Sequence, residues 1–266
     1  MAREGGGSMP RSGRALFEKS KKRRRAREWV SDALLRPLAH RLVLGLYGTP
    51  VQPEHLVLFQ GLLGLVAAGL IAGGMGAWAA PLLPIKALLD NADGQLARAR
   101  DQASQLGRYL DTEVDFLVNL ALFWALGRAT GAWALAAGAF ILLTLLLSAD
   151  YALNSEKTLP PCRGREPWAG WLAAGYALIF GPQDRLFETV FRRWPPPGWL
   201  GPVLANLGLS TQHALLALFL LFGSPLGYLV VVVLTFLLVL FGYLLGVWRT
   251  PSPPSPPSPS GPRGGS

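Results

Sequence analysis

Charged side chains are scarce in this 266-residue chain, and cysteine is almost absent. Only 15% of the residues are charged and 51% are apolar, whereas an ordinary soluble domain has about 25% charged residues. The single cysteine, Cys162, excludes an internal disulfide. No charged residue occurs in residues 56–85, 129–149 or 194–248. Because roughly 20 apolar residues suffice to cross a bilayer, and no polar stripe interrupts these runs, the pattern predicts membrane spans and excludes a large soluble helical core.

The basic residues are concentrated near the amino terminus. Twelve of the 25 Lys and Arg residues precede residue 42, and the net charge is +9. A basic block beside a first span is typical of contact with anionic lipid and of retention in the cytoplasm. No nucleic-acid recognition motif accompanies it, so nucleic acid is not an expected partner. The first apolar run follows this block instead of falling within the first 30 residues, so we expect no cleavable signal peptide.

The order of apolar runs and breaks predicts an all-α polytopic membrane protein, with six transmembrane helices preceded by an interfacial amphipathic helix. The leucines of residues 29–47 share one face, as in a helix that lies in the membrane interface. The spans are expected near residues 54–73, from 75 to Asp90, from Asp115 to 127, and near 129–150, 199–222 and 226–247. The flanking regions, 1–28 and 251–266, are expected to be a disordered basic cytoplasmic tail and a disordered Pro/Ser-rich tail, leaving 29–250 as the membrane domain.

Residues 167–183 are neutral, but a seventh span there would place Arg185, Arg192 and Arg193 outside the cell. The positive-inside rule disfavours that arrangement. We therefore predict an interfacial or re-entrant helix at 167–183. Both termini and the ends of the second and third spans then lie on the cytoplasmic side of the cell membrane.

The second and third spans are too short to cross the bilayer unless they carry aspartates below its surface. Only 75–89, apart from Lys86, and 116–127 are free of charge on these helices. A charged group at the centre of a span costs roughly 2.5–3.5 kcal/mol, and such groups mark functional cavities by default.

Four aspartates are spaced so that they meet. Asp90 and Asp93 are three residues apart, and Asp111 and Asp115 are four apart, so each pair shares one face of its helix. The topology puts both pairs around one cleft. Four carboxylates there would repel one another, and bound Mg²⁺ or Mn²⁺ would remove this repulsion. Two such ions would clamp a pyrophosphate.

The residues near the aspartates are small. Gly94, Ala97 and Gly107 would leave a groove for a flat ring or a phosphate, although close packing of membrane helices favours the same residue types. Both interpretations remain open from the pattern alone. Asp101 and Glu113 lie on other faces of the expected helices.

The complete segment reads Asp90-x-x-Asp93-Gly94-x-x-Ala97-Arg98, eight residues, then Gly107-x-x-x-Asp111-x-x-x-Asp115. It resembles the signature of the CDP-alcohol phosphotransferase (CDP-alcohol phosphatidyltransferase) family at every fixed position and spacing. Eight specified residues are very unlikely to align by chance. The resemblance extends to the six-span layout and covers roughly residues 29–250.

The resemblance implies a metal-dependent transferase of phospholipid biosynthesis. Asp90, Asp93, Asp111 and Asp115 would bind two Mg²⁺ or Mn²⁺ ions, and Asp115 would also act as general base on the acceptor hydroxyl. The acceptor would attack the β-phosphorus of the CDP-alcohol, and CMP would leave. Because such chemistry rests on positioning and charge neutralisation, carboxylates and metal are chemically sufficient.

The same resemblance assigns the CDP moiety to Gly94, Ala97 and Gly107, with Arg98 near the phosphates. CDP-diacylglycerol is the expected donor and a small polar alcohol the acceptor. The alternative is a soluble CDP-alcohol that donates to a lipid acceptor. A homodimer within the lipid bilayer is the assembly that the resemblance implies. A divalent-cation carrier or a non-catalytic membrane scaffold is the alternative from another class.

Two stretches depart from the family pattern. Residues 53–57 replace the Pro-Asn pair and Thr with which many members begin the first span, and residues 151–157 lack the Arg-rich stretch of members that act on phosphorylated acceptors. That absence argues against a phosphorylated acceptor unless other basic residues substitute. The candidates are Lys157, Arg163, Arg165 and Arg185.

Three further polar residues fall on the expected spans. Lys86 lies one turn before Asp90, as a phosphate ligand or a counter-ion for the carboxylates. Asn119 lies one turn after Asp115, where it would contact the acceptor or pack between helices. His213 is expected to be structural, with a role in the site as the alternative.

Overall fold

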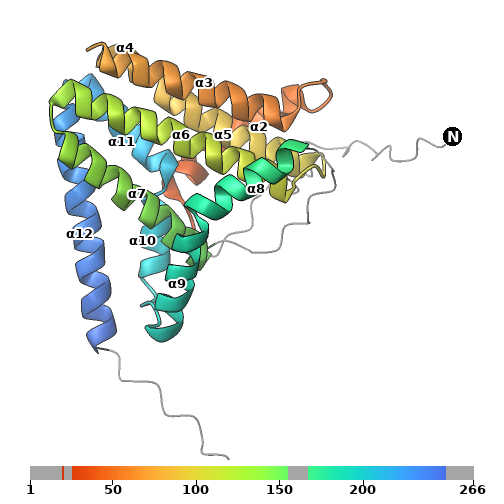
Figure 1. Ribbon diagram of the computed structural model, residues 1–266. Helices are drawn as coiled ribbons and strands as arrows, with labels where there is room; N and C mark the ends of the chain where they lie inside the picture. Colours follow the sequence, from red (N-terminus) through yellow and green to blue (C-terminus); the bar gives the residue numbers. More distant parts are fainter. Residues whose placement is uncertain (1–19, 21–25, 155–166, 250–266) are drawn as a thin grey trace, which may run out of the picture.

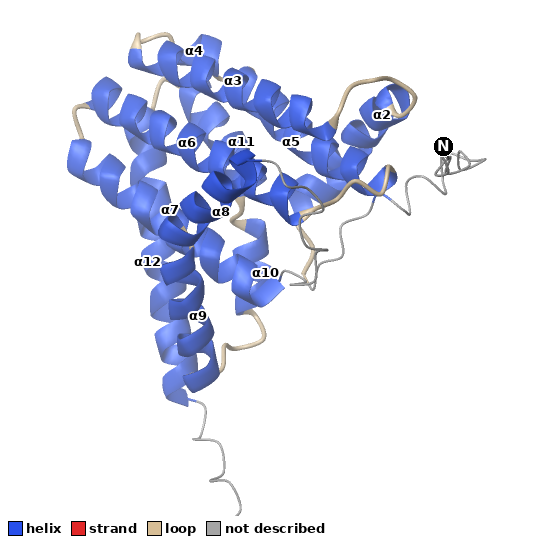
Figure 2. Ribbon diagram, turned by 45° about the vertical axis from the view of Figure 1, so that its right-hand side comes forward, coloured by secondary structure: helices blue, strands red, loops and turns tan. Residues whose placement is uncertain are grey.

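The computed structural model describes Ser20 and residues 26–154 and 167–249 (Figure 1). Every regular element in these residues is a helix (Figure 2), so the predicted all-α class is confirmed for this part of the chain. The elements are a π-helical turn, η1 (Ser31–Leu35), and the helices α2 (Arg36–Leu46), α3 (Pro53–Ala72), α4 (Gly76–Ala79), α5 (Leu82–Ala99), α6 (Gln105–Thr130), α7 (Trp133–Asn154), α8 (Pro167–Ile179), α9 (Gly181–Arg193), α10 (Leu200–Asn206), α11 (Leu209–Leu221) and α12 (Pro225–Arg249).

Three helices, α3, α7 and α12, are long and apolar enough to cross a membrane, and a fourth crossing arises if the pair α10–α11 counts as one span. The prediction of six spans is therefore supported only in part. Helices α5 and α6 carry several charged residues and are not among the helices that are apolar enough to count as spans. The span predicted near 199–222 is not a single helix in the structure, because it consists of α10 and α11, which are bent by 50°. The backbone is extended at Gly208, which caps the start of α11 and ends the continuity.

Helix α3 packs against both α5 and α6 (Figure 1), and the three helices together form the layer that carries the aspartates. Two glycines of α3 allow the close approach of α6. A Cβ atom on Gly61 would lie 2.5 Å from a methyl of Val114, and one on Gly64 would lie 2.3 Å from a methyl of Val118. Any larger residue at these positions would push the helices apart, so the glycines fix the spacing of the layer that carries the aspartates.

The turn between α5 and α6 is built by local hydrogen bonds. Helix α5 ends at Ala99, and Asp101 adopts a left-handed conformation with φ of 58°. The hydroxyl of Ser104 then caps α6 by accepting the backbone N–H of Gly107 at 3.1 Å. This turn brings the amino-terminal end of α6, with Asp111 and Asp115, back beside α5.

Helix α2 packs against α5, with Ala39 and Val43 buried in a small apolar cluster and Leu38 and Leu44 exposed. The guanidinium of Arg100, just after α5, donates hydrogen bonds to backbone carbonyls at the end of α2 and in the loop that follows it. Its acceptors are the carbonyl oxygens of Leu46, Tyr47, Thr49 and Val51, at 2.5–3.2 Å. A helical segment is thus present at the predicted position, as η1 and α2, and it is tied to the end of α5. Its place in the membrane interface stays a prediction.

The predicted interfacial segment 167–183 consists mainly of α8, a helix of 13 residues. Its length of about 20 Å is too short to cross about 30 Å of hydrocarbon. Helix α9 follows with Arg185, Arg192 and Arg193 exposed. Helix α12 extends away from the bundle (Figure 1) and exposes large apolar side chains such as Leu238 and Trp248.

Candidate active site

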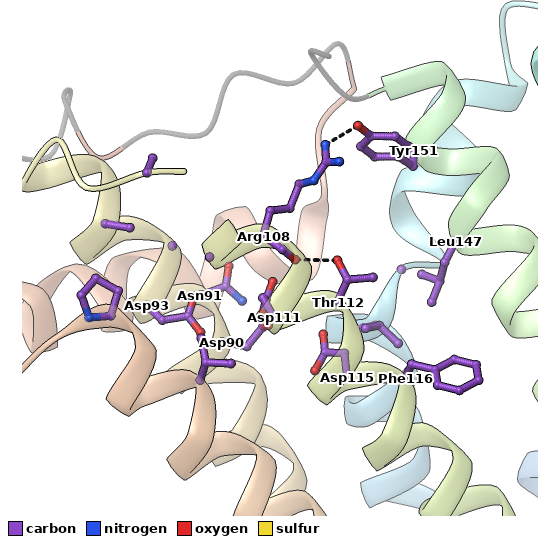
Figure 3. A pocket seen from close by; sticks show the side chains of 18 of the residues that line it. Asp90, Asn91, Asp93, Arg108, Asp111, Thr112, Asp115, Phe116, Leu147 and Tyr151 are labelled. Carbon is purple, nitrogen blue, oxygen red and sulfur yellow. Dashed lines mark hydrogen bonds between the residues drawn. The ribbon is translucent and has the colours of Figure 1, made fainter. Parts of the chain in front are cut away.

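Three of the four predicted aspartates converge. Asp90 and Asp93 from α5 and Asp111 from α6 point toward one another (Figure 3), and each offers one carboxylate oxygen such that these oxygens all lie within 4.8 Å of one another. Asp93 is only 5% exposed, and its Oδ2 is buried without a hydrogen-bond partner among the described residues. Such an oxygen calls for a ligand, and an all-carboxylate set suits Mg²⁺ or Mn²⁺. The geometry therefore fits the expected cation.

The fourth aspartate, Asp115, lies one helical turn beyond Asp111 and is paired differently. Its Oδ1 accepts hydrogen bonds from Nζ of Lys86 on α5 at 2.6 Å and from Nε2 of Gln60 on α3 at 3.4 Å. Lys86 is 1% exposed and Asp115 is 8% exposed. Since three helices meet at this carboxylate, the contact is a buried ion pair that also joins the layer together.

The aspartates line a cavity of about 810 Å³ that runs between α5, α6, α7 and α8. The predicted residues that line it are Asp90, Asp93, Gly94, Ala97, Arg98, Gly107, Asp111, Asp115 and Asn119. Lys86 and His213 are not part of the lining. Nine carboxylates and three guanidinium groups line the cavity, an imbalance that favours the uptake of cations.

The two glycines of the motif contribute space in different ways. A Cβ atom on Gly94 would lie 3.1 Å from Nη1 of Arg98, whereas one on Gly107 would meet only the Ser104 hydroxyl, at 3.5 Å. Arg98 itself donates from Nε to the carbonyl of Ser20 at 2.7 Å. The side chain of Arg98 therefore limits the free space beside Gly94, whereas the space beside Gly107 is open to the cavity.

The remaining polar residues have mainly structural contacts. The Asn119 amide donates to the backbone carbonyl of Asp115 at 2.8 Å, although its side chain also reaches the cavity. His213 on α11 is 3% exposed, and its Nε2 has no hydrogen-bond partner among the described residues. Asp101 lines the cavity, contrary to the prediction that it faces elsewhere. The prediction extended α5 past its true end at Ala99, where the chain turns. The side chain of Glu113 instead lies beside Gly175 of α8.

A group on the other side of the cavity was not predicted. Arg108 donates a hydrogen bond to the hydroxyl of Tyr151 (Figure 3), and its guanidinium lies 5.0–5.6 Å from the ring centroids of Tyr109, Tyr151 and Tyr176. The sequence did carry a signal, because Arg108 precedes Asp111 by three residues and Asp115 by seven, which places it on the same helical face.

Of the basic residues named as substitutes for the missing Arg-rich stretch, only Arg185 belongs to the described part of the chain, and it does not line the cavity. Lys157, Arg163 and Arg165 lie outside the described residues, and Arg185 is exposed on α9.

Comparison with known proteins agrees with the geometry. Residues 51–192 match the family model of CDP-alcohol phosphatidyltransferase. A protein of Rubrobacter xylanophilus, "Bifunctional IPC transferase and DIPP synthase", is 29% identical over 106 residues, which are 40% of this chain and 24% of that protein. The chain thus matches about a quarter of the length of this relative.

Proposed function

The chain belongs to the CDP-alcohol phosphatidyltransferase family, a family of transferases, and from this premise we propose that it transfers a substituted phosphate group from CDP-diacylglycerol to a small acceptor alcohol and releases CMP. The observation that carries the proposal is the convergence of Asp90, Asp93 and Asp111 on one point of a large cavity. The family relationship supports a CDP-alcohol donor and an alcohol acceptor, and the acidic site supports a divalent metal.

Different residues of the cavity would have different roles, according to their positions. Asp90, Asp93 and Asp111 would hold Mg²⁺ or Mn²⁺, which supplies neutralisation of the pyrophosphate charge. Gly94, Ala97 and Gly107 leave the open side of the cavity next to this point, where the cytidine would lie, with Arg98 beside the phosphates.

Asp115 would accept the proton of the acceptor hydroxyl. Both of its side-chain contacts use Oδ1, so Oδ2 is the oxygen that can serve the substrate. Lys86 and Gln60 would hold the carboxylate in the orientation that presents Oδ2 to the cavity. In this role Lys86 is a positioning residue for the general base, and Asn119 fixes the backbone of the same turn.

The proposal is tested by following CMP. Purified protein in detergent, given CDP-diacylglycerol, Mn²⁺ or Mg²⁺ and a panel of alcohols, is expected to release CMP, and Asp115→Asn is expected to lower the rate by at least about 100-fold, as for a lost general base. Glu113→Gln is the matched control, because it removes a carboxylate from the same helix outside the cavity. Near wild-type turnover by Asp115→Asn would refute the base assignment.

The other candidate functions make different predictions in the same preparation. A soluble CDP-alcohol that supports CMP release only with a lipid acceptor would reverse the donor assignment. Uptake of divalent metal into vesicles without CMP release would favour a cation carrier, and neither activity would favour a scaffold.

The arrangement in the membrane is part of the proposal. We place the domain at residues 29–250, with six crossings, both termini and the cavity on the cytoplasmic side of the cell membrane, and two copies in a homodimer. The three apolar helices support membrane insertion. Protease digestion of oriented vesicles is expected to remove terminal tags only when the cytoplasmic face is accessible.

A further inference from the structure

Arg108 is a cation in the cavity that makes no ion pair among the described residues. The other two guanidinium groups of the lining are engaged, since Arg36 forms ion pairs with Glu28, at 3.5 Å, and Asp32, and Arg98 donates to the carbonyl of Ser20. Arg108 donates one hydrogen bond to a neutral hydroxyl, and its Nε is buried without a hydrogen-bond partner in the described part of the chain. A half-buried guanidinium whose buried Nε lacks a hydrogen-bond acceptor calls for an anion.

Three tyrosines hold the guanidinium in place without neutralising it. The rings of Tyr109, Tyr151 and Tyr176 come from α6, α7 and α8, so the cation fixes three helices relative to one another. Stacking on aromatic faces leaves the guanidinium N–H groups that do not bind the Tyr151 hydroxyl, Nε among them, available for an acid group. The Tyr176 hydroxyl donates to Asp184 at 3.0 Å, and burial together with this carboxylate raises the pKa of Tyr176 above its ordinary value, so the ring stays uncharged.

The position of Arg108 indicates that it binds the acceptor and not the CDP-linked donor. The small residues Gly94 and Ala97 lie on α5, whereas Arg108 reaches toward α7 and α8, on the far side of the aspartates (Figure 3). Arg108 and Asp115 are seven residues apart on one face of α6, or about 10 Å of helical rise. A molecule of sugar size that presents a hydroxyl to Asp115 could therefore place an acid group at Arg108.

Resting on the proposed function, we propose that Arg108 and its three tyrosines form the binding subsite for an acid group of the acceptor, so that the acceptor alcohol carries a phosphate or a carboxylate. The subsite supplies, from within the catalytic helix, an arginine that residues 151–157 lack. No other guanidinium of the described lining lies on this side of the cavity without an ion pair.

The test compares matched acceptors and matched variants. Glycerol, glycerol 3-phosphate and glycerate are offered to the wild type, to Arg108→Gln and to Arg128→Gln, which removes an exposed arginine from the other end of α6. The wild type is expected to prefer an anionic acceptor. Arg108→Gln is expected to raise the KM for that acceptor roughly 10- to 100-fold, the value of a charge-assisted pair, while the KM for the donor stays within about twofold. Arg108→Lys, which keeps the charge and the cation–π contact, is expected to fall between.

A binding measurement separates the two proposals. Inorganic phosphate is titrated calorimetrically into the detergent-purified protein, with size-exclusion chromatography to show that each variant is folded. Phosphate binding that is lost in Arg108→Gln but kept in Arg128→Gln supports the subsite, even if no alcohol yields CMP and the proposed function fails. CMP release with no preference for anionic acceptors, or phosphate binding unchanged in Arg108→Gln, overturns the subsite and leaves the transferase assignment standing. The relative rates with the phosphate and carboxylate acceptors identify which acid group is used.

Discussion

The pair of Lys86 and Asp115 offers the sharpest test of how the layer of α3, α5 and α6 is held together. Nζ of Lys86 lies 2.6 Å from Oδ1 of Asp115, and the lysine is 1% exposed. In Lys86→Met the aliphatic stem, which packs beside Gly64, is retained while the charge is removed. The carboxylate of Asp115 then remains buried, with only the amide of Gln60 as a side-chain donor.

The expected cost follows from the loss of one partner of a buried ion pair. Breaking such a pair is destabilising by about 3–5 kcal/mol, because the remaining charge is uncompensated, whereas replacing both partners by neutral groups is often nearly neutral. Lys86→Met is therefore expected to lower the free energy of unfolding by about 3–5 kcal/mol. The double variant with Asp115→Asn is expected to recover more than half of that loss.

The assay is unfolding in mixed micelles by increasing mole fraction of sodium dodecyl sulfate, followed by tryptophan fluorescence and far-UV circular dichroism. The two single variants and the double variant form a thermodynamic cycle, whose coupling energy is expected to exceed about 1.5 kcal/mol. Additive effects, or a loss below about 1 kcal/mol in Lys86→Met, would refute the reasoning, because the two groups would then not act as a buried pair.

Three other predictions concern packing, metal and cavity shape. Gly64→Ala places a methyl 2.3 Å from a methyl of Val118 and is expected to cost about 1–3 kcal/mol in the same unfolding assay, whereas Gly69→Ala, with nothing within 4 Å, is expected to be neutral or stabilising. Addition of a chelator is expected to abolish CMP release, and excess Mn²⁺ to restore it; activity that survives exhaustive chelation would contradict a metal-dependent site. Gly107→Leu is expected to fold normally, since a Cβ there meets only the Ser104 hydroxyl at 3.5 Å, but to raise the KM for the donor about tenfold or more by filling the cavity; an unchanged KM would show that the donor lies elsewhere.

The pairing of the aspartates on common helix faces could be predicted because it depends on local periodicity. Asp90 and Asp93 share a face whenever their segment is helical, and the same holds for Asp111 and Asp115. The structure confirms that both segments are helical and brings three of the four carboxylates together. The assignment of these residues to metal and catalysis stays a prediction.

The partner of Asp115 was harder to foresee. Lys86 falls near the face of α5 that carries Asp90, so the sequence could place it near the carboxylates but not choose among them. The choice depends on how α5 is rotated against α6, and on the closeness of α3, which brings Gln60 to the same oxygen. Both are tertiary features. The closeness of α3 to α6 depends on Gly61 and Gly64, whose packing role no periodic pattern reveals.

The breaks in the helices were the least predictable part of the fold. The apolar run 199–222 contains no charge to mark the bend before Gly208, and hydropathy does not distinguish one span from two bent segments. The turn at Asp101 was likewise missed, because a left-handed aspartate after a helix leaves no trace in an apolar pattern. Arg108 was overlooked for another reason, since two of its three tyrosine neighbours, Tyr151 and Tyr176, come from α7 and α8, far along the chain.

The four carbonyl contacts of Arg100 have a mechanical consequence. They attach the end of α2 and the loop after it to the carboxyl end of α5. A movement of α2 along the membrane normal would therefore also move α5, with Asp90 and Asp93. Leu38 and Leu44, on the exposed side of α2, are the groups that would seek the acyl boundary of a bilayer. If α2 lies in the membrane interface as predicted, its depth would set the depth of the acidic cleft, and a change in lipid packing around α2 would act on the cleft.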